Sequence, residues 1–329
     1  MHIAGLGKHG EKAWYQYKLI RVYNPRETID MLEIMDLLVR IYNIFFGASV
    51  LFLIAVGLNI IYGVMKIVNL AHPAFFVLGC YTIAGTGMGV MINIFGSSII
   101  PLLITPPLLA AFVVAVSSLL IFPLFLFISG KGDEVQLLIT YGLLLIFEDI
   151  FRLIWGSEPL RASQPFELAG SLSIGEYLIP VYNIYVIISA LVIALILWIF
   201  LFKSKSGLLL RASSMDIEMA AALGANVKKV LLLTVLIASF LAGLGGGLFI
   251  PSASAMLGMS VEFLVLAFVV VVIGGLGSFL GSLVGAFIVS VLRTITLILF
   301  PELELALIYI VAIIILTLKP EGLGGGKKW

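Results

Sequence analysis

The sequence contains little charge for its length. Of 329 residues only 11% are charged, against about 25% in ordinary soluble domains, and 62% are hydrophobic. The charged residues are clustered, so the long stretches between the clusters offer no polar face to water. This composition excludes an ordinary soluble domain and indicates an integral membrane protein.

Cysteine is nearly absent, and the signatures of several other protein classes are missing. Cys80 is the single cysteine and lies in an apolar run, so an intrachain disulfide is excluded and no redox compartment follows. The stretch "GGLGSFLGSLVG" lacks the lysine and the hydroxyl residue of a phosphate loop. The first thirty residues contain no apolar core of a signal peptide. We expect no ATPase site, catalytic residue, cofactor, metal or nucleic-acid partner.

The apolar runs predict transmembrane helices rather than barrel strands, because they are continuous and reach the roughly 20 residues that a helix needs. We therefore expect an all-α, polytopic bundle of eight to ten spans. The run 99–128 is long and contains four prolines, so it is expected to be tilted or broken. The candidate spans are 43–63, 73–93, 99–128, 137–155, 181–202, 230–250, 261–276, 280–299 and 305–318.

The last part of the chain leaves the number of spans open. Residues 261–299 are divided only by "GGLGSFLG". The pattern fits two short crossings and also one re-entrant pair of helices.

Lysine and arginine are concentrated in four segments that alternate with the expected spans. The opposite loops hold only Arg161. Because cytoplasmic loops retain Lys and Arg, these four segments are predicted to face the cytoplasm. They are 64–72, 129–136, 203–229 and the tail from 319, with Lys66, Lys131, Lys203, Lys205, Arg211, Lys228, Lys229, Lys319, Lys327 and Lys328.

Residues 1–41 form a polar extension ahead of the transmembrane part, 42–329. They carry six basic and five acidic residues, and the charge bias does not fix their side. Asn24 as a cap, Pro25 at the first helical position and Glu27 three residues after the cap predict the start of a helix. Charges recur among apolar residues from there, which predicts an amphipathic helix at the interface that leads into the first span. Plain membrane anchoring is the alternative role.

Two sets of glycines recur at a spacing of four residues. They are Gly243 and Gly247 in one stretch and Gly277, Gly281 and Gly285 in another. Such spacing forms a smooth helix face on which another backbone can approach closely. This face can serve packing within the chain or against a partner subunit.

The stretch 203–229 is the longest polar interruption between the expected spans. Ser213 is placed to cap a helix, Asp216 follows three residues later, and Gly224 is placed for a left-handed stop. This predicts a helix of about ten residues, roughly 15 Å long. Such a helix suits docking in a groove of another protein, and a solvated linker helix is the alternative.

One group of polar residues interrupts a strongly apolar region of the chain. Lys66 can extend its ammonium to water, and Pro73 is tolerated at the start of the next helix. A broken helix here places Asn69 and His72 where they can line a cavity. Helix capping by Asn69 and His72 is the alternative.

A second polar group, Glu148, Asp149 and Arg152, falls inside a predicted span. Glu148 and Arg152 are four residues apart and are expected to pair. An unpaired charge at the bilayer centre costs at least about 2.5–3.5 kcal/mol, so all three should face protein or a wet cavity. The pair is interpreted as structural or as a contact for gating or for a zwitterion.

Five stretches together resemble one family. "EMAAALG", residues 218–224, resembles the loop signature of ABC-transporter permeases: a Glu, an Ala two residues on and a Gly six residues on. Four others resemble segments of the branched-chain amino-acid ABC transporter permeases, in the order of that family. They are "GLNIIYGVMKIVNLAHPAFFVLG", "LLITYGLLLIFEDIFRLIWG", "GGLGSFLGSLVGA" and "LKPEGLGG". The match covers about residues 45–325.

The resemblance implies an importer in the cytoplasmic (inner) membrane. An extracytoplasmic solute-binding protein would deliver the solute, a second homologous permease subunit would complete the path through the lipid bilayer, and two cytoplasmic ABC ATPase subunits would drive transport. The substrate class implied is branched-chain or related amino acids, with urea or short amides as the alternative. Members of the family usually have Gly and Glu where this chain has Pro73 and Ala74, so a carboxylate function there must be absent or met differently.

The resemblance also implies roles for individual residues. Those expected to couple the chain to the ATPase are Arg211, Asp216, Glu218, Ala220 and Gly224. Those expected to line the translocation path are Asn69, His72, Glu148 and Arg152. Two rival classes explain less. A secondary transporter or channel accounts for the intramembrane polar residues but not for the loop 218–224, and a membrane scaffold accounts only for the glycine faces.

Overall fold

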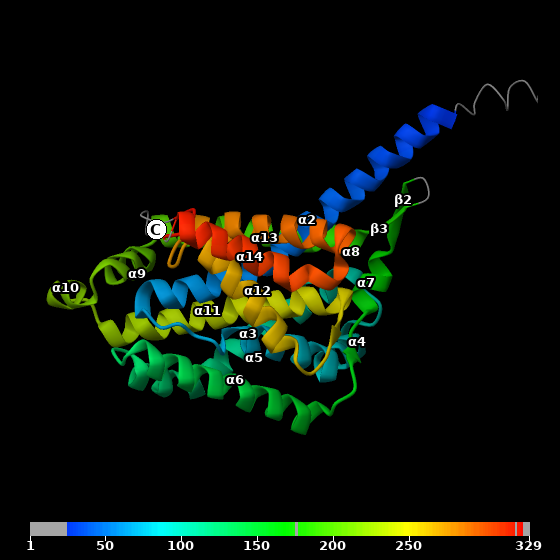
Figure 1. Cartoon of the computed structure of the whole chain (residues 1–329). Helices are drawn as coiled ribbons and strands as arrows, with labels where there is room; N and C mark the ends of the chain where they lie inside the picture. Colours follow the sequence, from blue (N-terminus) through cyan, green and yellow to red (C-terminus); the bar gives the residue numbers. More distant parts are fainter. Residues whose placement is uncertain (1–24, 175–176, 320, 325–329) are drawn as a thin grey trace, which may run out of the picture.

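The computed structural model describes residues 25–174, 177–319 and 321–324. Long helices run side by side in one bundle, and short strands lie at one end of it (Figure 1). The expected all-α bundle is confirmed. The long helices are α2 (Pro25–Met65), α5 (Ile99–Ile128), α6 (Asp133–Trp155), α8 (Val181–Lys203), α11 (Val227–Phe249), α12 (Met259–Gly274), α13 (Phe279–Leu299) and α14 (Glu304–Leu318).

Shorter elements complete the chain. The second apolar segment is built from α3 (His72–Thr82), the π-helical turn η1 (Ile83–Gly87) and α4 (Met88–Phe95). The two helices of the polar loop are α9 (Lys205–Met215) and α10 (Ile217–Ala222). The remaining elements are β1 (Leu160–Arg161), α7 (Gln164–Ala169), β2 (Ser171–Ile174), β3 (Tyr177–Pro180), η2 (Ile250–Ser252), β4 (Ser254–Ala255) and η3 (Pro301–Leu303).

Six helical stretches are long and apolar enough to cross a membrane, which differs from the eight to ten that we expected. They are Met35–Met65, His72–Phe95, Ile99–Ile128, Val181–Lys203, Val227–Ser252 and Phe279–Leu299. The difference falls on three helices that do occur where spans were predicted. Met259–Gly274 and Ala306–Leu318 are apolar but shorter, and α6 carries five charged residues.

The helix α2 is continuous over 41 residues, so the described part of the polar extension and the first span form one element. Its first described residue is Pro25, and the predicted cap Asn24 and the rest of the extension lie outside the described residues. The Tyr42 hydroxyl donates to the Pro180 carbonyl, 2.7 Å away, where β3 ends. The N-terminal half of α2 therefore leaves the bundle at the end that carries the strands (Figure 1).

The helix α5 is also continuous, so of the two alternatives that we expected, a tilted or a broken helix, the broken one is wrong. It contains Pro106, Pro107 and Pro123 and runs for 30 residues, about 45 Å. Pro107 lies against α11, where a Cβ on Gly247 would come within 2.6 Å of the Pro107 Cα. A bare glycine on the neighbouring helix thus provides room for the proline-containing backbone.

The core is centred on α11, which packs against α2, α3 and α5. Close approach depends on the glycines of "GLGGG". A Cβ on Gly246 would lie 2.1 Å from the Phe76 carbonyl oxygen of α3, and one on Gly243 would lie 2.8 Å from the Ala110 carbonyl oxygen of α5. The structure therefore places Gly243 and Gly247 in contacts within the chain.

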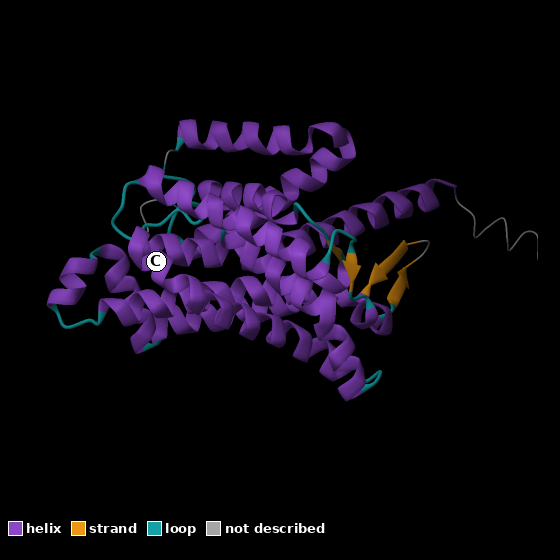
Figure 2. Ribbon diagram, turned by 90° about the horizontal axis from the view of Figure 1, so that it is seen from below, coloured by secondary structure: helices purple, strands orange, loops and turns teal. Residues whose placement is uncertain are grey.

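Two small antiparallel sheets lie at the end of the bundle opposite α10 (Figures 1 and 2). β1 pairs with β4, with Leu160 opposite Ala255, and β2 pairs with β3. The segments 64–72, 129–136 and 203–229 lie at the other end, with α9, α10 and the described C-terminal residues (Figure 1). The strands and the start of α2 therefore lie opposite the end that the charge pattern predicts to face the cytoplasm.

Candidate functional site

The chain is unwound between α2 and α3, as the polar residues there predicted. Lys66 has a left-handed backbone with φ of 53°, and its Nζ donates to the Gly63 carbonyl at 2.6 Å. A Cβ on Gly57 would lie 2.7 Å from the His72 Nε2. Gly57 is about two turns, or about 12 Å, from Met65, the C-terminal end of α2. Residues 66–71 therefore run back along α2, and α3 begins inside the bundle.

Asn69 and His72 are fully buried at this break. The Asn69 Oδ1 accepts from the Ala71 backbone N–H at 3.1 Å, which closes the turn ahead of α3. The Asn69 Nδ2 has no partner in the described chain, and neither ring nitrogen of His72 makes a hydrogen bond of ordinary geometry there, although the ring lies beside the Ile54 backbone. Among the described residues no side chain caps α3, so the capping alternative is wrong.

The turn between α12 and α13 is held by Asn59, a fully buried residue of α2. Its Nδ2 donates to the Ser278 carbonyl at 3.1 Å and to the Ser282 Oγ at 2.6 Å, and its Oδ1 accepts from the Gly277 N–H at 2.9 Å. One side chain thus satisfies three polar groups of a turn inside the bundle. We did not select Asn59 from the sequence, although an amide in an apolar helix is a usable signal.

Glycines bring α12 and α13 together beside that turn. A Cβ on Gly281 would lie 2.1 Å from the Gly274 carbonyl oxygen, and one on Gly285 would lie 2.3 Å from the Val270 carbonyl oxygen. Gly277 was expected on the same helix face but belongs to the turn, where its φ is 79°. Its conformation, rather than helix packing, explains a glycine there.

The C-terminal residues complete the inner end of α12. The Leu323 N–H donates to the Ile273 carbonyl at 2.8 Å, and the Gly324 N–H donates to the Gly274 carbonyl at 2.9 Å. These bonds satisfy two of the carbonyls that a helix leaves open at its end. Residues 321–324, "EGLG", therefore close the C-terminal end of α12.

The predicted pair of Glu148 and Arg152 is wrong. Both carboxylate oxygens of Glu148 accept from the start of α12: Oε2 from the Gly258 N–H at 2.8 Å and Oε1 from the Ser260 N–H at 3.3 Å. Arg152 instead pairs with Asp149, one turn away on an exposed face of α6. The competing donor is a helix N-terminus, whose orphan N–H groups and dipole attract a carboxylate.

The polar loop forms two helices, α9 and α10, where we predicted one. The cap of α10 is Asp216, whose Oδ1 accepts from the Met219 N–H at 2.8 Å. Ser213, the predicted cap, is buried inside α9. Gly224 has φ of 91°, so the predicted left-handed stop is confirmed. The predicted first residue of the helix was wrong because Ser213 and Asp216 are both residue types that cap helices well. In the structure Asp216 is the cap.

The helix α10 projects from the end of the bundle opposite the strands (Figure 1). Met215, Met219 and Leu223 follow one another at a spacing of four residues and have 71%, 58% and 83% of their surface exposed. This row of apolar side chains, 215/219/223, lies outside the membrane helices. Ala220 is buried, Asp216 and Glu218 are exposed, and the Arg211 guanidinium lies 5.1 Å from the centre of the Phe202 ring.

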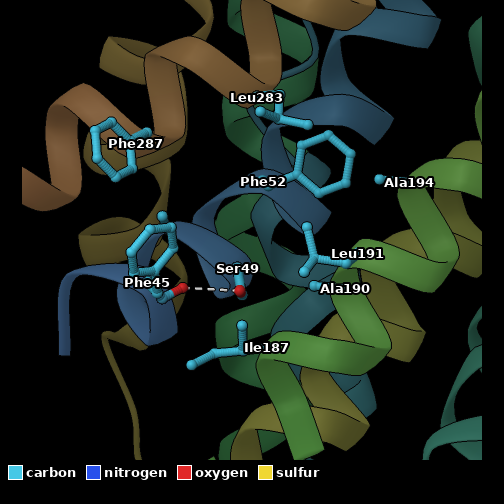
Figure 3. A pocket seen from close by; sticks show the side chains of 10 residues that line it. Phe45, Ser49, Phe52, Ile187, Ala190, Leu191, Ala194, Leu283 and Phe287 are labelled. Carbon is cyan, nitrogen blue, oxygen red and sulfur yellow. Dashed lines mark hydrogen bonds between the residues drawn. The ribbon is translucent and has the colours of Figure 1, made fainter. Parts of the chain in front are cut away.

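Among the cavities between the described helices are three that neither Asn69 nor His72 lines. The first, of about 120 Å³, lies between α2, α8 and α13 and is framed by Phe45 and Phe287, whose ring centres are 5.6 Å apart (Figure 3). The second, of about 610 Å³, is lined by apolar residues of α5, α8 and α11. The third, of about 480 Å³, lies between α2 and α13 and is lined by charged and apolar residues.

Comparison with known proteins gives one consistent result. The profile of the family described as "Branched-chain amino acid transport system / permease component" matches residues 40–317. No solved structure matches the chain.

Curated relatives cover most of the chain at low identity. The chain is 24% identical to the high-affinity branched-chain amino acid transport system permease protein LivH of Salmonella typhimurium, over 83% of this chain and 90% of the relative. It is 25% identical to BraD of Pseudomonas aeruginosa, a permease protein with the same description, over 79% and 86%. It is 26% identical to a probable branched-chain amino acid transport permease protein LivH of Methanocaldococcus jannaschii, over 74% and 76%.

Proposed function

This chain belongs to the family of permease components of branched-chain amino acid transport systems, and from that premise we propose that it is the membrane subunit of an ABC importer. It would carry leucine, isoleucine, valine or related amino acids across the cytoplasmic membrane. A second homologous permease subunit, two ATPase subunits and an external binding protein would complete the complex.

The observation that carries this proposal is the exposed apolar row 215/219/223, in which Met215 ends α9, Met219 lies on α10 and Leu223 follows α10. Exposed apolar side chains on and beside a short helix are suited to insertion into a groove of another protein. Because α10 lies at the end rich in Lys and Arg, that protein would be cytoplasmic. An ATPase that docks there can perform mechanical work on the permease.

The surroundings of α10 support a mechanical role. Asp216 fixes its start, Gly224 fixes its end, and Asn226 caps α11 by accepting from the Lys229 N–H at 3.1 Å. A displacement of α10 would therefore pass directly to α11, the helix at the centre of the bundle. Movement of α11 against α3 and α5 would shift the equilibrium between outward-open and inward-open states.

The residues of the translocation path are part of the proposal. Asn69 and His72 lie at the intramembrane helix break and carry unused hydrogen-bonding atoms in the described chain, which suits a group exposed in another transport state. Glu148 and Arg152 already make structural contacts in this state. We therefore assign the translocation path to Asn69 and His72 ahead of Glu148 and Arg152.

Transport by inverted and right-side-out vesicles that contain the full complex tests the proposal. Leucine uptake should require the binding protein outside and ATP on the side of α10, and the ATPase should copurify with the permease. Uptake driven by an ion gradient without ATP would instead establish a secondary transporter. Competition by urea or acetamide, but not by valine, would assign the complex to short amides.

A variant at Gly224 tests the coupling step. Gly224→Val places a β-branched residue at a positive φ, which that residue tolerates poorly, and should uncouple ATP hydrolysis from uptake. Gly224→Asn is the matched control, since Asn adopts this conformation more readily. Unchanged uptake and ATPase association in Gly224→Val would refute the assigned role of α10.

A further inference from the structure

The cavity of about 480 Å³ between α2 and α13 differs from the other two in its charge. Asp36, Arg40 and Asn43 of α2 lie on one side of it, and Arg293 and Thr294 of α13 lie on the other. Its size falls within the range of about 300–1,000 Å³ typical of small-molecule sites.

Both arginines are anchored and keep unused donors. The Arg40 Nε donates to the Asp36 Oδ2 at 2.6 Å. The Arg293 Nε donates to the Glu304 Oε1 at 2.5 Å, and its Nη2 donates to the Glu262 Oε1 at 3.3 Å. A guanidinium has five N–H donors, so each arginine retains N–H groups that bond to nothing in the described chain. These groups suit a carboxylate.

Acceptors and neutral polar groups are available at the same place. The second carboxylate oxygen of Asp36 has no partner among the described residues and suits an ammonium group. The side chains of Asn43 and Thr294 also make no hydrogen bond within the described ranges. A zwitterion supplies one carboxylate and one ammonium, and it adds no net charge to these paired residues.

The inner part of the cavity is apolar. Phe46, Val50 and Leu51 of α2 meet Phe249 and Phe263 there. The Phe249 and Phe263 rings stand edge to face with centres 5.5 Å apart. A branched aliphatic side chain would be buried against these groups, whereas an amide or a sugar would leave polar groups unpaired on them.

The cavity lies at the external side of the membrane part. At 1.5 Å per residue, Arg40 lies about 38 Å and Leu51 about 21 Å from the inner end of α2. Because the hydrocarbon is about 30 Å thick, the charged groups lie at the external interface and the apolar floor lies within the membrane. A solute released on the external face would meet the charged end first.

We propose that this cavity is an external reception site that binds an aliphatic amino acid as its zwitterion, with the carboxylate at Arg40 and Arg293 and the ammonium at Asp36. The proposal rests on the proposed function, because it gives the transported solute a first binding site on the permease itself. It also assigns selection for an apolar side chain to the permease, in addition to any selection by the binding protein.

Site-directed thiol labelling tests the site without requiring transport. Cys80 is fully buried, so a Cys80→Ala chain with Asn43→Cys carries one reactive thiol, inside the proposed site. Right-side-out vesicles that contain the full complex would be treated with a membrane-impermeant maleimide, with and without leucine. The free-site fraction is 1/(1 + [L]/Kd), so leucine at ten times its Kd should slow labelling about tenfold.

Matched variants separate binding in the cavity from general effects. Ser157→Cys lies on the same external side, on an exposed loop, and should be labelled at the same rate with and without leucine. Adding Arg40→Gln to Asn43→Cys should abolish protection by leucine while the thiol remains reactive. Arg40 is the chosen arginine because its partner Asp36 is on the same helix, so its loss should not release another helix.

The outcomes distinguish this inference from the proposed function. If leucine leaves the labelling rate of Asn43→Cys unchanged while the wild-type complex imports leucine with ATP, the reception site is refuted and the importer stands. If leucine protects Asn43→Cys while uptake needs no ATP, the site stands and the ABC importer is refuted. Equal protection by glucose and by leucine would refute recognition of a zwitterion.

Discussion

The Glu148 carboxylate of α6 lies at the N-terminus of α12, with its Oε2 2.8 Å from the Gly258 backbone nitrogen. The two residues are 110 positions apart in the chain. This contact joins a helix at the periphery of the bundle to one that packs against α2, α3 and α13. Arg152, the partner expected from sequence spacing, contributes nothing to it.

The first prediction concerns this contact. Glu148→Ala should lower the stability of the solubilised protein by about 1–2 kcal/mol, because it removes a cap and a charge that complements the dipole of α12. Thermal unfolding of the purified permease in detergent would measure the change. Asp149→Ala is the matched control on the same helix and should change stability by less than about 1 kcal/mol, since its pair with Arg152 is exposed. Equal effects of the two variants would contradict the capping role.

The second prediction concerns Asn59. Asn59→Asp should destabilise the protein more than Asn59→Ala does, because a carboxylate oxygen would face the Ser278 carbonyl in place of the amide N–H. Each buried group left without its bond costs about 1–3 kcal/mol, so both variants should reduce folded yield. Fluorescence-detected size-exclusion chromatography of the tagged chains would measure that yield.

An exposed asparagine provides the comparison for Asn59. Asn93 lies on α4, and Asn93→Ala should leave the yield unchanged. A normal yield for Asn59→Asp would show that the turn between α12 and α13 does not depend on this side chain.

Residue patterns predicted the helices better than they predicted the contacts between them. Each of the nine apolar segments forms helix, because hydrophobic runs of that length have few alternatives in a membrane. The sequence predicted an interfacial helix that leads into the first span, and the structure joins the two in the single helix α2. Patterns of charged and capping residues also do not determine which group each of these side chains contacts. Glu148 had a suitable partner at four residues, but the N-terminus of α12, far away in sequence, is the better one.

The third prediction concerns the row 215/219/223. Met219→Asp should abolish copurification of the ATPase and ATP-driven uptake, because it places a charge in the centre of the row that would be buried on docking. Ala221→Asp is the matched control, since it lies on another exposed face of the same short helix. Both variants should insert and fold normally. A loss of ATPase in both, or in neither, would show that the row is not the docking surface.

The fourth prediction compares two glycines inside helices. A Cβ on Gly281 of α13 would lie 2.1 Å from the Gly274 carbonyl oxygen, whereas one on Gly142 of α6 would meet nothing within 4 Å. Gly281→Ala must push two backbones apart and should cost about 3 kcal/mol, the upper end of the range for overpacking. Gly142→Ala should leave stability unchanged or raise it by up to about 1 kcal/mol, since Ala is the better helix former.

The position of Gly281 gives its substitution a second consequence that stability alone does not report. It lies beside the turn held by Asn59 and near the C-terminal residues, because the Cβ would also approach Ser278, whose carbonyl accepts from Asn59. Separation of α12 from α13 should therefore expose the C-terminal tail to proteolysis from the cytoplasmic side. Limited proteolysis of inverted vesicles, with detection of a C-terminal tag, should show faster cleavage in Gly281→Ala than in Gly142→Ala. Equal cleavage rates and equal melting temperatures would mean that the close approach of Gly274 and Gly281 is not needed to hold α12 and α13 together.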